Sequence, residues 1–567
     1  MEKFSLITAL VIETKQATRT QIRALLDGLD ISQVQFASSA SSAIRILQDE
    51  TFDLILCAHD LGDEHQDGQH LLEDLRTNAL ITRQTLFFML YSSAQQQEVM
   101  SAADLSPDGV LVKPFTAHVL QSRLAQALVR REHFMPLYRA LQEGRTELAI
   151  EYCLHAEERH PRYRDDFARE RAELLFADGQ HQEAHDVFAE IAAGESRPPW
   201  AELGVIRCLI ALRQLDEAQA RLTPLLEEHP LFLAANDCRT QIFEARGDLL
   251  AARQSLEDSL KLAPDRISRL RACARLSLQL EDPAAAEEAM AKVLSNNRYS
   301  TFRDPQDHLR MLNLLIDGQR LEEADNILCK LERGFGEASL HVLCRDLARG
   351  RIAAARGDKE AAATCTRRAY QLLQQIGLDA LGDTLSDDTL KDMTDQLLEN
   401  ELEDEACALT RERIRTAPNQ QSLNAARATL RELGRKELAE EIEARLDETA
   451  REFLDRSEEL DKEGRPEEAV LVLMQATSAL PGNPHVLVNT AIALIRSLRE
   501  QDWVIGTADH AMELLVRARQ IDPENSRANQ LIRHLKQLAR ERKIENAFTI
   551  DPTAPEAADT PPPAERT

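Results

Sequence analysis

The sequence predicts a doubly wound α/β domain with five parallel strands over residues 1–131, followed by an all-α array of helix pairs over residues 132–543. Short apolar runs alternate with helical patterns up to about Arg131, which is typical of a parallel sheet covered by helices. From Gly144 onward, a turn followed by Glu-Ala or a related pair recurs about every 34 residues. Residues 544–567 are rich in Pro, Ala and acidic side chains, so we expect a disordered tail.

The elements of the first domain follow from these apolar runs. Parallel sheets bind ligands at the carboxyl ends of their strands, near the point where the strand order reverses. We therefore expect the functional residues just after the strands. The predicted strands are 6–12, 33–38, 52–58, 85–92 and 109–113, and the predicted helices are 17–29, 42–50, 68–76, 94–104 and 117–131.

Charge and cysteine usage exclude several classes of protein. The 567 residues include 68 Lys plus Arg and 96 Asp plus Glu, a net charge of −28. This balance argues against nucleic acid and against an anionic membrane surface as partners. The nine cysteines are scattered and form no CxxC pair, which argues against structural zinc and indicates a reducing, cytoplasmic location. No phosphate-binding glycine loop, HExxH or GxSxG motif is present, so we expect no enzyme and no cofactor.

A Lys-Pro-Phe tripeptide at 113–115 follows the fifth predicted strand, Asp53 begins the third, and Asp67-Gly68 precedes the next helix. On these features the first domain resembles CheY-like response regulators. The resemblance implies a phosphorylation site made of an acidic pair after strand one, an acceptor Asp ending strand three, a hydroxyl residue ending strand four and a Lys ending strand five. In this sequence those positions hold Glu13 with Thr14, Ala58, Tyr91 and Lys113.

The mapped positions predict a pocket that no longer takes a phosphoryl group. The methyl group of Ala58 cannot attack phosphorus, and Glu13 alone supplies too few hard oxygens for Mg²⁺. We expect Glu13 and Lys113 to form a structural ion pair instead, in a degenerate receiver that needs no metal. The register of the fourth strand leaves Ser92 open as the hydroxyl residue in place of Tyr91.

Two alternatives remain open in the loop after the third strand. Asp60 or Asp63 would become the phosphoacceptor if the register of the third strand were shifted. Because side chains alternate between the two faces of a strand, a shift of two residues would point Asp60 to the same side as residue 58. Separately, the segment 59–70 crowds histidines and carboxylates that metals accept as ligands. A solvated polar loop is the simpler interpretation, because no fixed ligand spacing is visible.

The array shows two independent periodic signals. The first five alanines that close the motif are separated by 35, 34, 34 and 34 residues. Six alanines, five of them motif alanines and the sixth Ala511, have a proline twelve residues later. Because proline ends a helix, it marks the end of the second helix of each pair. This period resembles tetratricopeptide repeats. The motif alanines are Ala149, Ala184, Ala218, Ala252, Ala286, Ala324, Ala362, Ala406, Ala439 and Ala469, and the alanines with a proline twelve residues later are Ala149, Ala218, Ala252, Ala406, Ala469 and Ala511.

Stacked helix pairs form a superhelix with an open inner groove that suits a protein ligand. Arg207 and Asn236 are candidate inner-face residues, although ordinary solvated positions are the simpler interpretation. The whole chain resembles bacterial response regulators with a tetratricopeptide output region, such as VieB-like proteins. This implies a non-catalytic signalling adaptor whose array holds or inhibits a client protein. A histidine kinase or a second response regulator would bind the receiver, and a homodimer is also open. The alternatives are phosphorylation at Asp60 and a structural assembly factor of a pilus or secretion machine.

Overall fold

The computed structural model describes residues 4, 6–62, 67–92, 107–194, 197–264, 266–296, 303–334, 338–378, 384–500, 503–523 and 525–542. Two compact units are present, and each is assembled from segments far apart in the sequence. The first contains Met1–Glu132, Phe188–Ala417 and Gln421–Leu446, and the second contains His133–Val187, Pro418–Gln420 and Asp447–Thr567. Within the described ranges, no helix combines the length and the apolar character that crossing a bilayer requires.

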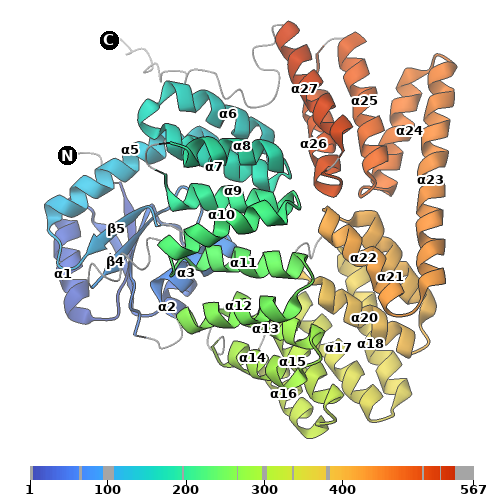
Figure 1. Cartoon of the computed structure of the whole chain (residues 1–567), viewed down its shortest axis with the longest axis horizontal. Helices are drawn as coiled ribbons and strands as arrows, with labels where there is room; N and C mark the ends of the chain where they lie inside the picture. Colours follow the sequence, from blue (N-terminus) through green and yellow to red (C-terminus); the bar gives the residue numbers. More distant parts are fainter. Residues whose placement is uncertain are drawn as a thin grey trace, which may run out of the picture. The chain divides into compact units, whose positions relative to one another are not determined.

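A parallel sheet of five strands lies in the N-terminal segment of the first unit (Figure 1). The strand order is β2-β1-β3-β4-β5, so the order reverses between β1 and β3. This confirms the predicted fold class, and every predicted strand is present to within two residues at each end. The strands are β1 Thr8–Ile12, β2 Gln33–Ala37, β3 Leu54–Ala58, β4 Leu86–Tyr91 and β5 Gly109–Val112, and the helices are α1 Gln16–Asp27, α2 Ala40–Asp49, α3 Gly68–Thr77 and α5 Ala117–Gln142.

Both faces of the sheet are buried, which explains why its strands read as continuous apolar runs. Alternate side chains of β1 enter two separate clusters. Leu10 and Ile12 pack on one side with α2 and α3, whereas Ala9 and Val11 pack on the other with α1 and α5. The parallel registers Ile12↔Cys57 and Ala58↔Leu90 then align the carboxyl ends of β1, β3 and β4.

The last helix of this domain differs from its prediction. We expected it to end at Arg131, but α5 continues to Gln142 and passes from the first unit into the second. Pro136 lies inside this helix and does not end it. The helix ends just before Gly144, whose φ of 71° is left-handed. The predicted helix at 94–104 and the tail at 544–567 lie outside the described residues, and the domain boundary at 131/132 remains a prediction.

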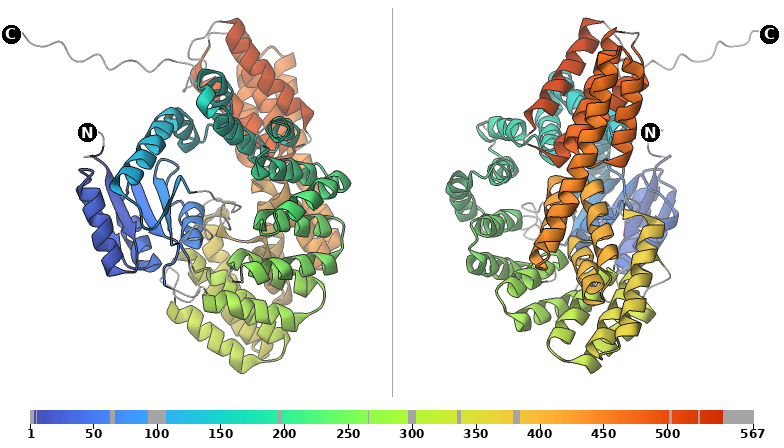
Figure 2. Two further views of the ribbon diagram at one scale, coloured as in Figure 1. Left: turned by 60° about the vertical axis from the view of Figure 1, so that its left-hand side comes forward. Right: turned by 90° about the vertical axis from the view of Figure 1, so that its right-hand side faces the viewer.

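The array of the first unit is a succession of antiparallel helix pairs, drawn green to orange in Figures 1 and 2. Two helices, α8 His181–Ala192 and α23 Lys436–Lys462, cross from one unit to the other. The remaining helices are α9 Pro199–Ala211, α10 Leu215–Glu228, α11 Leu233–Ala245, α12 Leu249–Leu262, α13 Ile267–Gln279, α14 Pro283–Asn296, α15 Pro305–Asp317, α16 Leu321–Gly334, α17 Ser339–Ala355, α18 Lys359–Ile376, α20 Asp387–Glu399, α21 Glu403–Thr416 and α22 Gln420–Glu432.

The second unit combines the first helices of the array with the last ones. Its described helices are α6 Thr146–Arg159, the short 3₁₀ helix η1 Pro161–Tyr163, α7 Arg164–Ala177, α24 Pro466–Ala479, α25 Pro484–Glu500, α26 Ile505–Ile521 and α27 Ser526–Glu541.

The repeat motif has the structural meaning that the sequence predicted. Each of the ten motif alanines lies near the start of the second helix of a pair and is at most 3% exposed. A methyl group at this position lets the two helix backbones approach closely. The prolines twelve residues later follow the ends of these helices, as Pro230 follows α10 and Pro264 follows α12.

The turn within each pair has one recurring backbone feature. The residue five positions before each motif alanine is left-handed, from Gly144 at φ 71° to Gly464 at φ 77°. Glycine adopts this conformation without a steric penalty, which explains the motif's frequent initial glycine. Four repeats place a residue with a side chain there instead: Arg213, Glu281, Gln319 and Glu401, with φ between 57° and 61°.

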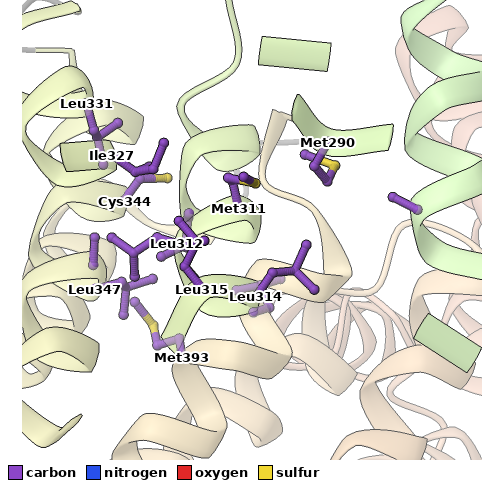
Figure 3. Close-up of a cluster of buried hydrophobic side chains, with 14 of the residues drawn as sticks. Met290, Met311, Leu312, Leu314, Leu315, Ile327, Leu331, Cys344, Leu347 and Met393 are labelled. Carbon is purple, nitrogen blue, oxygen red and sulfur yellow. The ribbon is translucent and has the colours of Figure 1, made fainter. Parts of the chain in front are cut away.

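The motif alanines lie farther apart after Ala324, at 38 residues from Ala324 to Ala362 and 44 residues from Ala362 to Ala406, and the helices there are longer. The pair α17 and α18 has 17 and 18 residues, whereas α13 and α14 have 13 and 14. Asp304 caps α15 by accepting a hydrogen bond from the Gln306 amide. Figure 3 shows the apolar core here, where Met311 and Leu315 of α15 meet Leu347 of α17 and Met393 of α20.

Candidate functional site

The carboxyl edge of the sheet gathers the residues that the sequence placed in one pocket. Glu13 follows β1, Ala58 ends β3, Tyr91 ends β4 and Lys113 follows β5. The backbone closes around them, because the Lys113 amide donates to the Tyr91 carbonyl and the His59 amide donates to the Leu90 carbonyl. Thr14 is half-buried behind Glu13. The structure thus brings Glu13, Ala58, Tyr91 and Lys113 to one edge of the sheet, and their role as a degenerate phosphorylation pocket remains a prediction.

Glu13 and Lys113 form the ionic centre of the pocket. The Lys113 Nζ donates to Glu13 Oε2 at 2.8 Å, and the Lys15 amide donates to Glu13 Oε1 at 3.0 Å. The Glu13 side chain is 1% exposed, whereas that of Lys113 is 22% exposed. Both carboxylate oxygens of Glu13 are thus engaged by donors from the chain itself. The expected structural ion pair is present in the geometry.

Ala58 is fully buried and packs in the same apolar cluster as Ile12 and Met89. The neighbouring thiol of Cys57 is also fully buried, and burial, with Asp67 and Glu13 nearby, raises its pKa far above the ordinary range. A thiol in this state is not an effective nucleophile, because the reactive species is the thiolate. The end of β3 therefore presents neither a carboxylate nor a reactive thiol.

Tyr91 is 2% exposed and turns its ring toward His59, with ring centroids 5.1 Å apart. Burial, with Asp67 and Cys57 nearby, raises the pKa of the Tyr91 hydroxyl to about 12. It therefore remains protonated at neutral pH. Ser92, the alternative hydroxyl residue, lies one position beyond the strand and is exposed.

Asp60, the alternative phosphoacceptor, lies outside the strand. It is exposed, and its Oδ1 accepts a hydrogen bond from the Gly62 amide at 2.9 Å. Asp53 lies at the opposite end of β3, where it accepts from Thr8 and from Arg131 at 3.2 Å. Asp63 lies outside the described residues, and whether Asp60 accepts a phosphoryl group remains untested.

Asp67 contributes to this edge in a way that the sequence did not show. A Cβ on the next residue, Gly68, would lie 2.5 Å from the Ala58 carbonyl oxygen, so only glycine permits this approach. The close approach brings the Asp67 carboxylate to 3.8 Å from the His59 ring. Part of the 59–70 cluster falls outside the described residues, and the described residues contain no group of three side chains placed to hold a metal ion.

The domain contacts its own array through α3, within the first unit. Glu73 of α3 forms an ion pair with Arg266, the residue before α13. Burial and the nearby Arg269 lower the pKa of Arg266, while Asp67 opposes this effect. Arg266 therefore lies in the electrostatic field of Asp67, the acid that borders the pocket. No sequence pattern predicted this contact.

Ion pairs link the first helices of successive repeats. Arg269 of α13 forms a bidentate ion pair with Asp237 of α11, with N–O distances of 2.8 and 2.6 Å. Arg271 does the same with Asp307 of α15 at 2.8 and 2.6 Å. These partners are 32 and 36 residues apart, close to the repeat period, which is a signal that the sequence analysis overlooked.

Neither candidate inner-face residue is an exposed position. Asn236 is 5% exposed and donates from its side chain to the Phe232 carbonyl at 3.2 Å. The interpretation of this position as solvated was wrong, because the side chain is buried. Arg207 is half-buried.

Comparisons with known proteins agree with this geometry. A model described as the response regulator receiver domain matches residues 9–125, and a tetratricopeptide repeat model matches residues 175–236. Chemotaxis protein CheY-3 of Vibrio cholerae is 25% identical over 121 residues, which are 21% of this chain and 91% of that protein. A probable CheY of Rhizobium etli is 25% identical over 118 residues, covering 21% and 89%.

Two solved structures resemble the array more distantly. A tetratricopeptide repeat protein from Parabacteroides merdae has a TM-score of 0.31 and 17% identity, covering 42% of this chain and 92% of that one. The Pseudomonas aeruginosa pilF structure has a TM-score of 0.30 and 18% identity, covering 38% and 94%.

Proposed function

We infer, because this chain joins a receiver domain of the response regulator family to tetratricopeptide repeats, that it acts in signalling through contacts with other proteins. We propose further that it is a cytoplasmic, non-catalytic adaptor whose receiver works without phosphorylation. In this proposal the array holds or inhibits a client protein, and the receiver docks on a histidine kinase or a second response regulator.

The observation that carries the proposal is the buried methyl group of Ala58 at the end of β3. Phosphoryl transfer to a receiver needs a carboxylate nucleophile there, with hard oxygen ligands for Mg²⁺ around it. Here the one carboxylate that follows β1, Glu13, already accepts from Lys113 at 2.8 Å and from the Lys15 amide. The lysine is therefore neutralised by the chain itself rather than held ready for a phosphoryl group.

The ion pair between Glu73 and Arg266 supports a mechanical link between receiver and array. Arg266 precedes the first turn of α13, and α13 carries the pairs of Arg269 and Arg271 to the neighbouring repeats. A partner that binds the receiver near α3 would compete with this link. In this way a binding event on the receiver reaches the array without a covalent change.

Incubation with acetyl phosphate and Mg²⁺, followed by intact mass measurement, tests the proposal. We expect no acid-stable, base-labile phosphoryl adduct on the wild-type chain. An adduct that disappears in Asp60→Ala would overturn the proposal and identify Asp60 as the acceptor. An adduct that persists in Asp60→Ala would equally overturn it and place the acceptor elsewhere.

The link through α3 is tested by charge reversal. Glu73→Lys should change which proteins the tagged chain captures from cell extract, and Glu73→Lys with Arg266→Glu should restore the original set, because the pair is rebuilt with opposite polarity. Lys292→Glu, which alters an exposed ion pair on α14, is the matched control. Identical capture by all variants would mean that the receiver does not act on the array through this contact.

A further inference from the structure

The first and last helices of the array belong to the second unit, and the buried side chain of Arg519 links them there. Arg519 lies on α26 and is 1% exposed. Its Nη2 donates to Glu147 Oε1 of α6 at 2.5 Å and to the carboxylate of Asp178, the residue after α7. These partners are 372 and 341 residues away in the sequence.

The two carboxylates are enclosed almost completely. The side chains of Glu147 and Asp178 are 6% and 0% exposed. Lys536 of α27 donates to the second oxygen of Glu147 at 2.8 Å, and Gln180 donates to Asp178 at 2.9 Å. Two negative and two positive side chains therefore balance within one buried group, which we call the Arg519 cluster: Glu147, Asp178, Arg519 and Lys536.

The backbones also approach each other beside this cluster. A Cβ built on Gly179 would lie 3.6 Å from the Cβ of Pro523. At the rim, Arg145 pairs with Asp509 at 3.6 Å, and the exposed Arg533 pairs with Glu183 at 3.6 Å. The contact is therefore rich in ion pairs. Glu147, Asp178 and Arg519 are almost fully removed from solvent, whereas the Lys536 side chain is 20% exposed.

In such a contact, the cost of removing charges from water and the attraction between the buried charges are similar in size. Removing charges from water costs several kcal/mol per ion, and the mutual attraction of buried ions only approximately offsets this cost. Within the Arg519 cluster, Asp178 Oδ1 and Arg519 Nε are buried and have no hydrogen-bond partner among the described residues, which further reduces the gain on closing. Helix α6 packs on α7 on one side of the contact, and α25 packs on α26 on the other, so we expect each pair to stay folded when the contact opens.

We propose that Glu147 and Asp178 form a guanidinium-binding site that Arg519 occupies from within the same chain, and that release of Arg519 opens the two ends of the array. In the closed state both carboxylates accept charge-assisted hydrogen bonds from one guanidinium nitrogen, Nη2, and Nη1 donates to Asn529 Oδ1 at 3.2 Å. In the open state the same two carboxylates become accessible to an arginine of a bound partner. The site thus links closure of the array to the binding of a cationic side chain.

Closure is measured with a disulfide between the two ends. In Gly179→Cys/Pro523→Cys, the Cβ separation of 3.6 Å lies within the range that a disulfide bridges. The exposed Cys329 is replaced by serine. Oxidised glutathione takes two electrons from the two thiols, which yields the intramolecular disulfide and two molecules of reduced glutathione. In buffers of reduced and oxidised glutathione, the equilibrium ratio of disulfide to dithiol gives the effective concentration of the two introduced thiols relative to each other. A high effective concentration means that the two ends of the array are held together.

We expect Arg519→Ala in this background to lower the effective concentration by about tenfold or more, because closure then buries Glu147 and Asp178 without the guanidinium that offsets their charges. Arg533→Ala, which removes only an exposed pair at the same contact, should leave it unchanged. Strain from a side chain at Gly179, whose φ is 79°, is the same in every variant and cancels from the comparison.

Chemical rescue separates a guanidinium site from a general loss of packing. Millimolar N-ethylguanidinium should restore the disulfide yield of Arg519→Ala, whereas N-ethylurea, which has a similar shape and no charge, should not. Arg519→Lys provides a second variant if Arg519→Ala folds poorly, and it should give an intermediate effective concentration. The proposal fails if the parent pair does not oxidise, if neither Arg519 variant lowers the effective concentration, or if N-ethylurea rescues as well as N-ethylguanidinium.

Discussion

Replacing Lys113 with methionine tests whether the ion pair between Lys113 and Glu13 stabilises the receiver. The change keeps most of the apolar stem of the side chain and removes the charge. Glu13 is 1% exposed, so it would remain buried with only the Lys15 amide as a donor at 3.0 Å. Removing one partner of a buried pair is costly because the other charge remains without compensation.

The magnitude follows from the geometry of the pair. Two unit charges 2.8 Å apart attract by about 6 kcal/mol at an effective dielectric constant of about 20. The partial exposure of Lys113 and the remaining hydrogen bond from Lys15 reduce the net effect. We therefore expect Lys113→Met to destabilise the receiver by about 3 kcal/mol. Adding Glu13→Gln should recover at least about 1 kcal/mol, since the uncompensated charge is then gone.

Hydrogen exchange of the amides in β1 and β3, followed by mass spectrometry, measures this local opening free energy without requiring the whole chain to unfold in one step. Lys292→Met is the matched control, because Lys292 and Glu288 are also 2.8 Å apart but are 56% and 71% exposed. It should change the exchange of α14 by less than about 0.5 kcal/mol. If Lys113→Met is as mild as Lys292→Met, the pair does not stabilise the receiver and the reasoning is refuted.

Three further predictions follow from particular residues. Gln319→Gly should stabilise the α15–α16 pair by up to about 1 kcal/mol and Gly357→Ala should destabilise the α17–α18 pair by about 1–2 kcal/mol, since both positions have a left-handed backbone. Hydrogen exchange of these helices measures both changes in stability. A change of the opposite sign for either substitution would contradict the assignment of these turns. Gly68→Ala should cost about 1–3 kcal/mol in the receiver because its Cβ would meet the Ala58 carbonyl, whereas Gly28→Ala, at φ −67°, should be nearly neutral in the same measurement. Burial raises the pKa of Glu147, but Lys536 and Arg519 outweigh burial and hold this pKa below the usual 4.5. A carboxyl group whose pKa is lowered by folding stabilises the fold at pH values above its unfolded-state pKa. Hydrogen exchange in α6 should therefore increase as the pH falls below about 4.5, and it should increase less in Glu147→Gln.

Much of the fold was predictable because its signals are local. The motif alanines and the prolines report the packing and the end of single helices, and the positive φ at Gly144 or Gly247 is a property of one turn. The end of α5 was harder, since Arg131 and His133 belong to the same unbroken helix and no glycine or capping residue separates them.

The pocket was predictable for a related reason. Glu13, Ala58, Tyr91 and Lys113 each lie at the end of a strand, and parallel strands bring such ends to one edge. The position of Asp67 was not predictable in this way. It depends on how closely Gly68 approaches the Ala58 carbonyl, which the spacing of strands does not fix.

The sequence by itself therefore determined the α/β receiver, the phase of the repeats and the position of Ala58 at the end of the third strand, because each depends on neighbouring residues or on a regular period. Only the tertiary structure decided that Glu73 meets Arg266 and that Arg519 is buried against Glu147 and Asp178. Such pairs join residues hundreds of positions apart, and nothing in the local chemistry of a charged side chain specifies which distant partner the folded backbone will bring to it.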